Sequence, residues 1–331
     1  ETDMIKDQHN RIHDYLRISL TEKCNLRCTY CMPADGIPLL PSSKLMSADE
    51  VFSIAKTFVE HGVSKIRLTG GEPLVRKDFE TIARSLSTLP VELAISTNGI
   101  LVDKHLALFK EIGLNKINLS LDSLDQEKFK HITRRDHFFK VMENLQLILE
   151  LDFEVKLNVV LMKGFNEDEI LDFIDFTKDK NVSVRFIEFM PFGGNNWKSD
   201  KLVSLASILD LAETRYGSNL IRLNDNVHDT TKNYTVEGYA GSWGVISTVT
   251  SPFCSGCNRM RITADGKMKN CLFDNNEMDL LAKHRNGESI APFIKMAVWD
   301  KHAVRGGMDT QEKFSDETLN QENRSMIAIG G

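Results

Sequence analysis

The sequence lacks the features that would send a chain into or across a membrane. No uninterrupted apolar run approaches the roughly 18 residues that a membrane-spanning helix needs. The first residues, from Glu1 to Lys6, lack the basic and then apolar pattern of a secretory signal. These absences predict a cytoplasmic protein without a membrane partner.

Excess positive charge and glycine-rich phosphate loops are also missing. The net charge of -6 argues against a nucleic-acid partner, which would call for a basic surface. The sole Gly-Lys pair, Gly266-Lys267, is followed by Met268, so the G-x-x-x-x-G-K-[ST] loop is absent, as is G-x-G-x-x-G. Any bound nucleotide must therefore be held by side chains.

In the first 190 residues, short β-branched segments alternate with segments of helical period. Strands are expected at 15–21, 64–69, 92–97, 115–121, 154–162 and 183–190, and helices at 47–61, 78–88, 102–112, 125–132, 137–151 and 167–180. The pair Ser47 and Glu50 has the spacing of a helix capping box. Regular alternation of this kind favours parallel strands joined by right-handed crossovers.

Six strand–helix units are too few for a closed barrel of eight units. The sequence therefore predicts an α/β fold, an open and partial TIM-like (β/α)6 barrel over residues 1–190. After a turn-rich break at 191–196 the pattern changes, with a helix expected at 204–216 and strands at 243–250, 259–263 and 267–271. Residues 191–331 are predicted to form a C-terminal α+β subdomain.

The six cysteines fall into two groups of three, and the first follows the first expected strand. Cys24, Cys28 and Cys31 offer three thiolates, whereas an iron–sulfur cluster usually takes four. Three ligands would leave one iron open to a small molecule. Structural disulfides are disfavoured in a large chain with clustered cysteines. A closed zinc site would need a fourth ligand, which no nearby residue supplies.

The second group is Cys254, Cys257 and Cys271. Between the last two, Asp265-Gly266 is a strong hairpin signal, and a hairpin would return Cys271 to the other two thiols. A zinc site stays open as an alternative, because Cys-x-x-Cys is common in zinc knuckles. A second cluster with an open iron is the sharper hypothesis.

Basic residues occur where charges are costly unless they are paired. Arg259 and Arg261 are two apart in an expected strand and so share one face. Guanidinium groups pair well with phosphate oxygens. The other basic residues on expected barrel strands are Arg17, Lys65, Arg67 and Lys156. Together they predict a site for a polyphosphate anion.

The Cys24–Cys31 spacing, with Tyr30 before the third cysteine, resembles the cluster motif of the radical S-adenosylmethionine (SAM) superfamily. Gly70-Gly71-Glu72-Pro73 is similar to the superfamily's second motif. Adding the second triad, the Cys257–Arg261 segment and the terminal Gly330-Gly331, nearly the whole chain resembles the GTP 3′,8-cyclase family. The double glycine alone is a weak signal, since flexible tails also end in this way.

The resemblance implies two 4Fe–4S clusters and SAM as cofactors, with the six cysteines as iron ligands. It implies these SAM contacts: Tyr30, Gly71, Glu72, Ser120 and Met190. It implies these GTP contacts: Arg17, Arg67, Ser96, Lys156, Arg259, Met260 and Arg261, with Arg17, Arg259 and Arg261 as the catalytic set. Ser96 stands where the family has threonine. The Gly-Gly tail is thought to reach the active site in this family, although a disordered end is the plainer expectation.

The resemblance also implies the reaction, in which a 5′-deoxyadenosyl radical removes the C3′ hydrogen of GTP and C3′ attacks guanine C8. This is the first step of molybdenum cofactor biosynthesis. The implied partners are a flavodoxin-like electron donor, a downstream cyclic pyranopterin monophosphate synthase and a second copy of the chain. Two alternatives are a radical SAM enzyme acting on a peptide or another nucleotide, and a non-enzymatic electron carrier or metal-dependent binding module. Both leave the basic strand positions unexplained.

Overall fold

The computed structural model describes residues 3–331, and its central feature is one 12-stranded sheet. The strands are β1 Tyr15–Ser19, β2 Lys65–Thr69, β3 Glu92–Thr97, β4 Lys116–Ser120, β5 Glu154–Leu161, β6 Val182–Glu188, β7 Leu220–Arg222, β8 Lys232–Val236, β9 Ser242–Ile246, β10 Arg259–Ile262, β11 Lys267–Lys269 and β12 Met278–Asp279. Their order in the sheet is β12-β11-β10-β1-β2-β3-β4-β5-β6-β9-β8-β7. The strands β1 to β6 are parallel neighbours in chain order, as predicted.

The sheet continues beyond these six strands on both sides. Strand β10 pairs with β1 and strand β9 pairs with β6, each in parallel. Antiparallel strands complete the two edges, so the sheet is mixed and does not close into a barrel. The open α/β fold is thus confirmed. Residues 191–331 supply strands to both sides of this same sheet.

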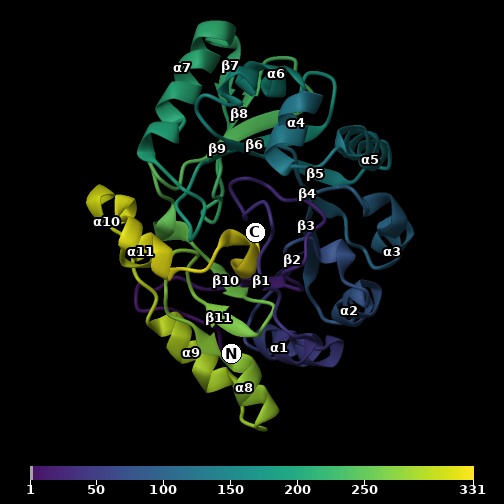
Figure 1. Cartoon of the computed structure of the whole chain (residues 1–331), viewed down its shortest axis with the longest axis vertical. Helices are drawn as coiled ribbons and strands as arrows, with labels where there is room; N and C mark the ends of the chain where they lie inside the picture. The colour runs from purple at the N-terminus through teal and green to yellow at the C-terminus, as the bar shows by residue number, and fades with distance from the viewer. Residues whose placement is uncertain (1–2) are drawn as a thin grey trace.

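Helices cover the convex face of the sheet (Figure 1). Those following the parallel strands are α1 Ala48–Glu60, α2 Phe79–Leu86, α3 Leu106–Glu111, α4 Gln126–Thr133, α5 Phe138–Glu150 and α6 Ile170–Asp175. The later helices are α7 Leu205–Tyr216, α8 Leu280–Arg285, α9 Ala291–Trp299, α10 Gln311–Ser315, α11 Glu317–Glu322 and α12 Met326–Ile329. The capping box at the start of α1 is confirmed: Ser47 Oγ accepts from the Glu50 amide, and Glu50 accepts from the Ser47 amide.

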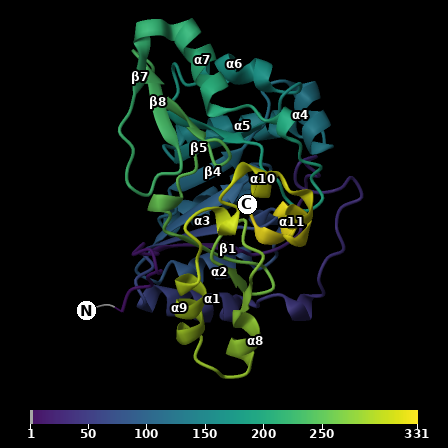
Figure 2. The same cartoon turned by 90° about the vertical axis from the view of Figure 1, so that its left-hand side faces the viewer.

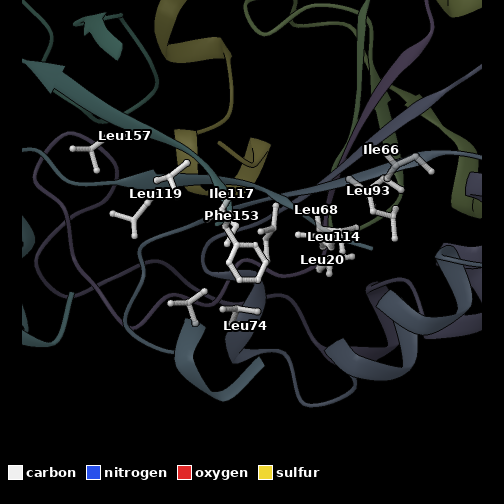
Figure 3. Packing of buried hydrophobic residues seen from close by; sticks show 14 of the residues in the cluster. Leu20, Ile66, Leu68, Leu74, Leu93, Leu114, Ile117, Leu119, Phe153 and Leu157 are labelled. Carbon is white, nitrogen blue, oxygen red and sulfur yellow. The ribbon is translucent and has the colours of Figure 1, made fainter. Parts of the chain in front are cut away.

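Alternation along each strand separates an apolar face from a polar one. In β5, Val155 and Leu157 are buried with the helices, whereas the intervening Lys156 faces the other side. Leu119 and Phe153 belong to the same apolar layer (Figure 3). Full burial of one such side chain contributes roughly 1.5–3 kcal/mol. The apolar layer therefore holds the helices on the sheet and leaves polar side chains on the concave face.

The last residues of the chain fold back across that concave face. Helices α10 and α11 lie on the open side of the curved sheet, and the C-terminus lies near the centre of the molecule in both views (Figures 1 and 2). Of the two possibilities left open for this tail, the structure shows an ordered segment that includes helix α12, not a disordered end. Among residues 3–331, no helix is both long and apolar enough to cross a membrane.

Candidate active site

A cavity with two adjoining parts lies on the concave side of the sheet. The first part contains the first cysteine triad together with residues at the carboxyl ends of β2, β3 and β4. The second part contains the second triad and most of the cationic residues. Asn158, Ile187, Met190, Met326 and Gly331 line both parts. The two triads therefore open onto a shared space.

The first triad lies in the loop between β1 and α1, and α4 holds this loop in place. The amides of Arg27 and Thr29 donate to the carbonyls of Thr133 and Ile132, each at 2.9 Å. The cysteines form no disulfide. Burial raises the pKa of Cys24 to about 11. A thiol in this state needs a bound cation to become a thiolate, as a coordinated metal provides.

The Gly70-Gly71 pair packs directly against the segment that leads into the triad. The Gly71 amide donates to Thr21 O at 2.7 Å, and the Glu72 amide donates to Lys23 O at 2.8 Å. A Cβ atom on Gly71 would lie 2.3 Å from Lys23 O, which no side chain tolerates. Glycine is required here by close approach of two backbones, and this contact fixes the cysteine loop against β2.

Glu72 ties the end of β2 to the end of β3. Its carboxylate accepts from Thr97 Oγ1 at 2.8 Å and from the Asn98 amide at 2.7 Å. Burial raises its pKa to about 7, although those donors act in the opposite direction. Asn98 in turn directs its Nδ2 toward Cys24 Sγ at 3.9 Å. Glu72 lines the first part of the cavity and organises the donors beside the triad.

Tyr30 is held by a buried carboxylate that was not among the predicted SAM or GTP contacts. Its hydroxyl donates to Asp122 Oδ2 at 2.8 Å, and Asp122 Oδ1 accepts from the Val160 amide at 2.8 Å. Burial raises the pKa of Asp122 to about 6. Its position two residues after the end of β4 was the available signal, because functional groups gather at strand ends in this architecture.

Within the second triad, Cys257 has a different electrostatic setting from the first three cysteines. The hairpin of β10 and β11 brings Cys271 to the same part of the cavity as Cys254 and Cys257. Burial raises the pKa of Cys257, but the cations of Lys301 and Arg259 outweigh it and hold the value at about 5. Cys257 is therefore set up as a thiolate.

Within the described chain, residues 3–331, no group of three His, Cys, Asp or Glu side chains is arranged to hold a single metal ion. A four-iron cube is larger than one ion, so this finding does not test a cluster. The fit of each triad rests instead on its chemistry: free cysteines that line a cavity and supply thiolates, the usual ligands of iron–sulfur clusters.

Cations from strands β1, β2, β5, β6 and β10 converge in the second part of the cavity: Arg17, Lys65, Arg67, Lys156, Arg185, Arg259 and Arg261. Burial and mutual repulsion lower the pKa of Arg17 to about 10 and that of Arg261 to about 9. Both remain protonated at neutral pH. A buried concentration of positive charge is costly without an anion, and guanidinium groups pair well with phosphate oxygens.

The structure places every residue predicted to contact SAM or GTP on the cavity wall except Met260. Ser96 and Ser120 line the first part and Met190 lines both. Met260 lies on the opposite face of β10, is 0% exposed and belongs to the hydrophobic core. Alternation explains this position, since Arg259 and Arg261 on either side face the cavity.

Arg185 and Tyr15 line the second part but were not among the predicted site residues. Arg67 Nε donates to the Tyr15 hydroxyl at 2.6 Å. Burial raises the pKa of Tyr15, but the cations of Arg67, Arg17 and Lys65 lower it overall to about 7. The signal for Arg185 was a charged residue between the buried Val184 and Phe186 of an expected strand.

The C-terminal tail enters the cavity and contacts two of the predicted catalytic arginines. Arg261 Nη1 donates to Gly330 O at 2.8 Å, and Arg17 Nη2 donates to Gly331 O. Gly330 has a φ of +90°, and a Cβ atom there would lie 2.8 Å from Ser19 Cβ. Glycine is therefore needed at this position for both conformation and space.

An arginine at the base of the tail anchors it. Arg324 donates to both oxygens of Asp265, at 2.9 and 3.0 Å, and to both oxygens of Glu277, at 2.6 and 2.7 Å. The two carboxylates lie at or beside the β10–β11–β12 edge of the sheet. The tail is thus fixed at its base by ion pairs and at its tip by the cavity arginines.

Comparison with known proteins identifies relatives along the whole chain. Residues 18–177 match the radical SAM superfamily and residues 182–305 match "Molybdenum Cofactor Synthesis C". The mitochondrial GTP 3′,8-cyclase of Arabidopsis thaliana is 47% identical, with 100% of this chain and 84% of that protein covered. The GTP 3′,8-cyclase of Limosilactobacillus fermentum is 40% identical, with 96% and 91% covered.

Some relatives are longer than this chain. The molybdenum cofactor biosynthesis protein moc-5 of Caenorhabditis elegans is 49% identical over 94% of this chain, which spans only 54% of that protein. Among solved structures, Streptococcus suis SuiB has a TM-score of 0.62 at 18% identity, covering 91% of this chain and 69% of SuiB. At that identity the likeness shows the fold alone. A further SuiB structure with S-adenosylmethionine bound has a TM-score of 0.58.

Proposed function

The chain belongs to the GTP 3′,8-cyclase family of radical SAM enzymes, and we propose that it converts GTP to (8S)-3′,8-cyclo-7,8-dihydroguanosine 5′-triphosphate. This reaction is the first step of molybdenum cofactor biosynthesis. The observation that carries the proposal is the shared cavity, in which two cysteine triads and a cluster of cations meet.

The first part of the cavity fits a 4Fe–4S cluster and SAM. Cys24, Cys28 and Cys31 are the three iron ligands. When bound, these groups supply a 5′-deoxyadenosyl radical that removes the C3′ hydrogen of GTP, so that C3′ can bond to guanine C8. The SAM contacts are Tyr30, Gly71, Glu72, Ser120 and Met190. The buried Tyr30–Asp122 and Glu72–Asn98 hydrogen bonds support this assignment, because they keep the wall rigid.

The second part fits GTP and a second 4Fe–4S cluster on Cys254, Cys257 and Cys271. Arg67 and Lys156 bind the triphosphate, with Arg17, Arg259 and Arg261 as the catalytic set that also stabilises developing charge. Each charge-assisted hydrogen bond contributes roughly 1.5–3 kcal/mol. Arg185 joins this group on its position in the cavity. Ser96 remains a proposed substrate contact, whereas Met260 acts through packing behind the arginines.

The remaining partners follow from the family and are part of the same proposal. They are a flavodoxin-like electron donor, a cyclic pyranopterin monophosphate synthase that takes the product, and a second copy of the chain as a homodimer. We also propose the cytoplasm as its compartment, although the Arabidopsis relative is named as mitochondrial. The boundary between the barrel and the cluster-bearing part is proposed at residue 190.

The decisive experiment is an anaerobic assay of the iron- and sulfide-reconstituted protein. After reduction, SAM is added with or without GTP, and 5′-deoxyadenosine and nucleotide products are followed by mass spectrometry. We expect GTP-dependent 5′-deoxyadenosine and a product with the mass of GTP. Formation of 5′-deoxyadenosine with intact GTP would keep the radical chemistry and reject the substrate.

Replacement of the β10 arginines tests the assigned roles. Arg259→Ala and Arg261→Ala each remove a charged donor from the cavity, and we expect product formation to fall at least about tenfold, which corresponds to one lost charge-assisted hydrogen bond. SAM binding, measured separately, should not change. Arg222→Ala is a matched control, since Arg222 lies on the edge strand β7 and pairs with Asp225 outside the cavity. Unchanged product yield in both β10 variants would refute their role.

A further inference from the structure

Lys301 is a buried cation beside the second cysteine triad. Lys301 follows helix α9, and only 3% of its surface is exposed to solvent. Its Nζ atom donates to Cys257 Sγ at 3.4 Å and to the carbonyl oxygen of Arg259 at 2.9 Å. Among the ion pairs of residues 3–331, none involves Lys301 and a carboxylate. A buried ammonium group is costly without an opposite charge, and the sulfur of Cys257 is the group in that position.

Neighbouring hydrogen bonds fix the backbone on both sides of the contact between Lys301 and the second triad. Arg11 Nη1 donates to Cys254 O at 2.8 Å and to Ala303 O at 3.0 Å, while its Nη2 donates to His302 O at 2.8 Å. The Asp7 carboxylate orients Arg11 through contacts to the Arg11 amide and Nε. The segment after Lys301 is therefore fastened to the loop that carries Cys254.

We propose that Lys301 is a positioning residue for the second cluster, which it orients through Cys257 and whose reduced state its charge stabilises. This inference rests on the proposed function, because it requires a cluster on the second triad. Hydrogen bonds to cluster sulfurs and nearby charge are known means of setting reduction potentials. One-electron reduction adds a negative charge to the cluster, and an adjacent ammonium lowers the free energy of that state.

The contact to Arg259 O gives Lys301 a second effect. Cys257 and Arg259 are separated by one residue, so a single ammonium group holds both the thiolate ligand and the start of strand β10. The first triad differs, because the donors to Cys24 Sγ are neutral, namely the Leu26 amide at 3.4 Å and Asn98 Nδ2 at 3.9 Å. The two clusters are therefore expected to differ in reduction potential, with the second more easily reduced.

The test isolates the second cluster. In a background with Cys24, Cys28 and Cys31 changed to alanine, only the second triad can hold iron, and we expect about four irons per chain. The variants are Lys301→Met, which keeps length and removes charge, and Lys301→Arg, which keeps charge. Lys295→Met is the matched control, since Lys295 lies on α9 and pairs with Asp3 at the surface. The potential is measured by redox titration with electron paramagnetic resonance.

We expect Lys301→Met to reduce the equilibrium constant for one-electron reduction about tenfold, a potential about 59 mV lower for a one-electron couple. Lys301→Arg and Lys295→Met should remain near the parent. If Lys301→Met loses its iron, retention of about four irons by Lys301→Arg supports the proposal, and loss in both variants rejects it. Full iron with an unchanged potential in Lys301→Met also rejects it. A parent protein without iron would instead refute the second cluster, and with it the two-cluster function.

Discussion

At the scale of single residues, Tyr15 gives the cavity a ligand-dependent proton site. Without an anion, the neighbouring cations lower its pKa to about 7, so at pH 8 the phenol is mostly ionised. A bound triphosphate neutralises those cations and moves the pKa back toward the ordinary value of about 10. We therefore predict that GTP binding at pH 8 takes up a proton, close to one per chain. Calorimetry in two buffers of different ionisation enthalpy measures this uptake.

The matched variant is Tyr15→Phe, which keeps the ring and removes the titrating group. Its proton uptake at pH 8 should vanish, whereas its binding of GTP should weaken only modestly. At pH 6 the phenol is already protonated in the free protein, so wild type and variant should then agree. Equal uptake by both proteins at pH 8 would show that another group takes the proton.

Residue chemistry was predictable to the extent that it follows from spacing and alternation. The two arginines of β10 and the cysteines line the cavity because their spacing places them on one face or one loop. The contacts of Asp122 and Lys301 were not predicted, because they are made across the fold. Asp122 meets Tyr30, which is 92 positions away, and Lys301 meets Cys257 from a turn that no motif marks. The roles of all these residues stay predictions.

At the scale of elements, the C-terminal tail contacts the cavity arginines, and a substitution at Gly330 tests whether this contact matters for the reaction. Gly330→Ala would place a Cβ atom 2.8 Å from Ser19 Cβ and 2.9 Å from Thr69 Oγ1. Because both neighbours belong to central strands, the tail must move rather than the sheet. We predict faster hydrogen exchange over residues 325–331 and at least about a tenfold loss of product, equivalent to about 1.4 kcal/mol. Exchange measured by mass spectrometry and the anaerobic assay provide the two readouts.

Gly287→Ala separates the effect of crowding from that of backbone strain. Gly287 also has a positive φ, +74°, but a Cβ atom there would meet nothing within 4 Å. This control should lose stability without changing tail exchange or product formation. If Gly330→Ala behaved in the same way as Gly287→Ala, the tail contacts to Arg17 and Arg261 would have no part in the reaction.

Local sequence pattern was enough to predict the elements that are stabilised by residues close in sequence. It was not enough to predict which segments far apart in sequence pack together. The predicted strand at 92–97 is β3 to the residue, and the capping box starts α1. Strand β10 was also predicted, but nothing in four residues indicates that they pair in parallel with β1. The ordered tail is similar, since it is held by distant contacts: the ion pairs of Arg324, the cavity arginines, and the packing of Ile329 in a hydrophobic cluster.

At the scale of the whole molecule, one sheet joins the two regions that the sequence separates at residue 190. Strand β1 pairs with β10 over four residue pairs, and β6 pairs with β9 over five. Removing residues 191–331 would therefore expose two strand edges in the middle of the sheet, together with apolar surface. Unpaired edges of this kind favour aggregation. The two regions are expected to depend on each other for stability.

We predict that the chain unfolds as one cooperative unit under anaerobic conditions. The tryptophans Trp197, Trp243 and Trp299 all lie after residue 190, so their fluorescence reports on that region alone. Far-ultraviolet circular dichroism reports on the helices of both regions, of which α1 to α6 form the larger share. Because both regions share one sheet, the two signals should give the same midpoint in guanidinium chloride, which is a test of two-state behaviour. Two separate midpoints would show that residues 1–190 fold independently and that the shared sheet contributes little to their stability.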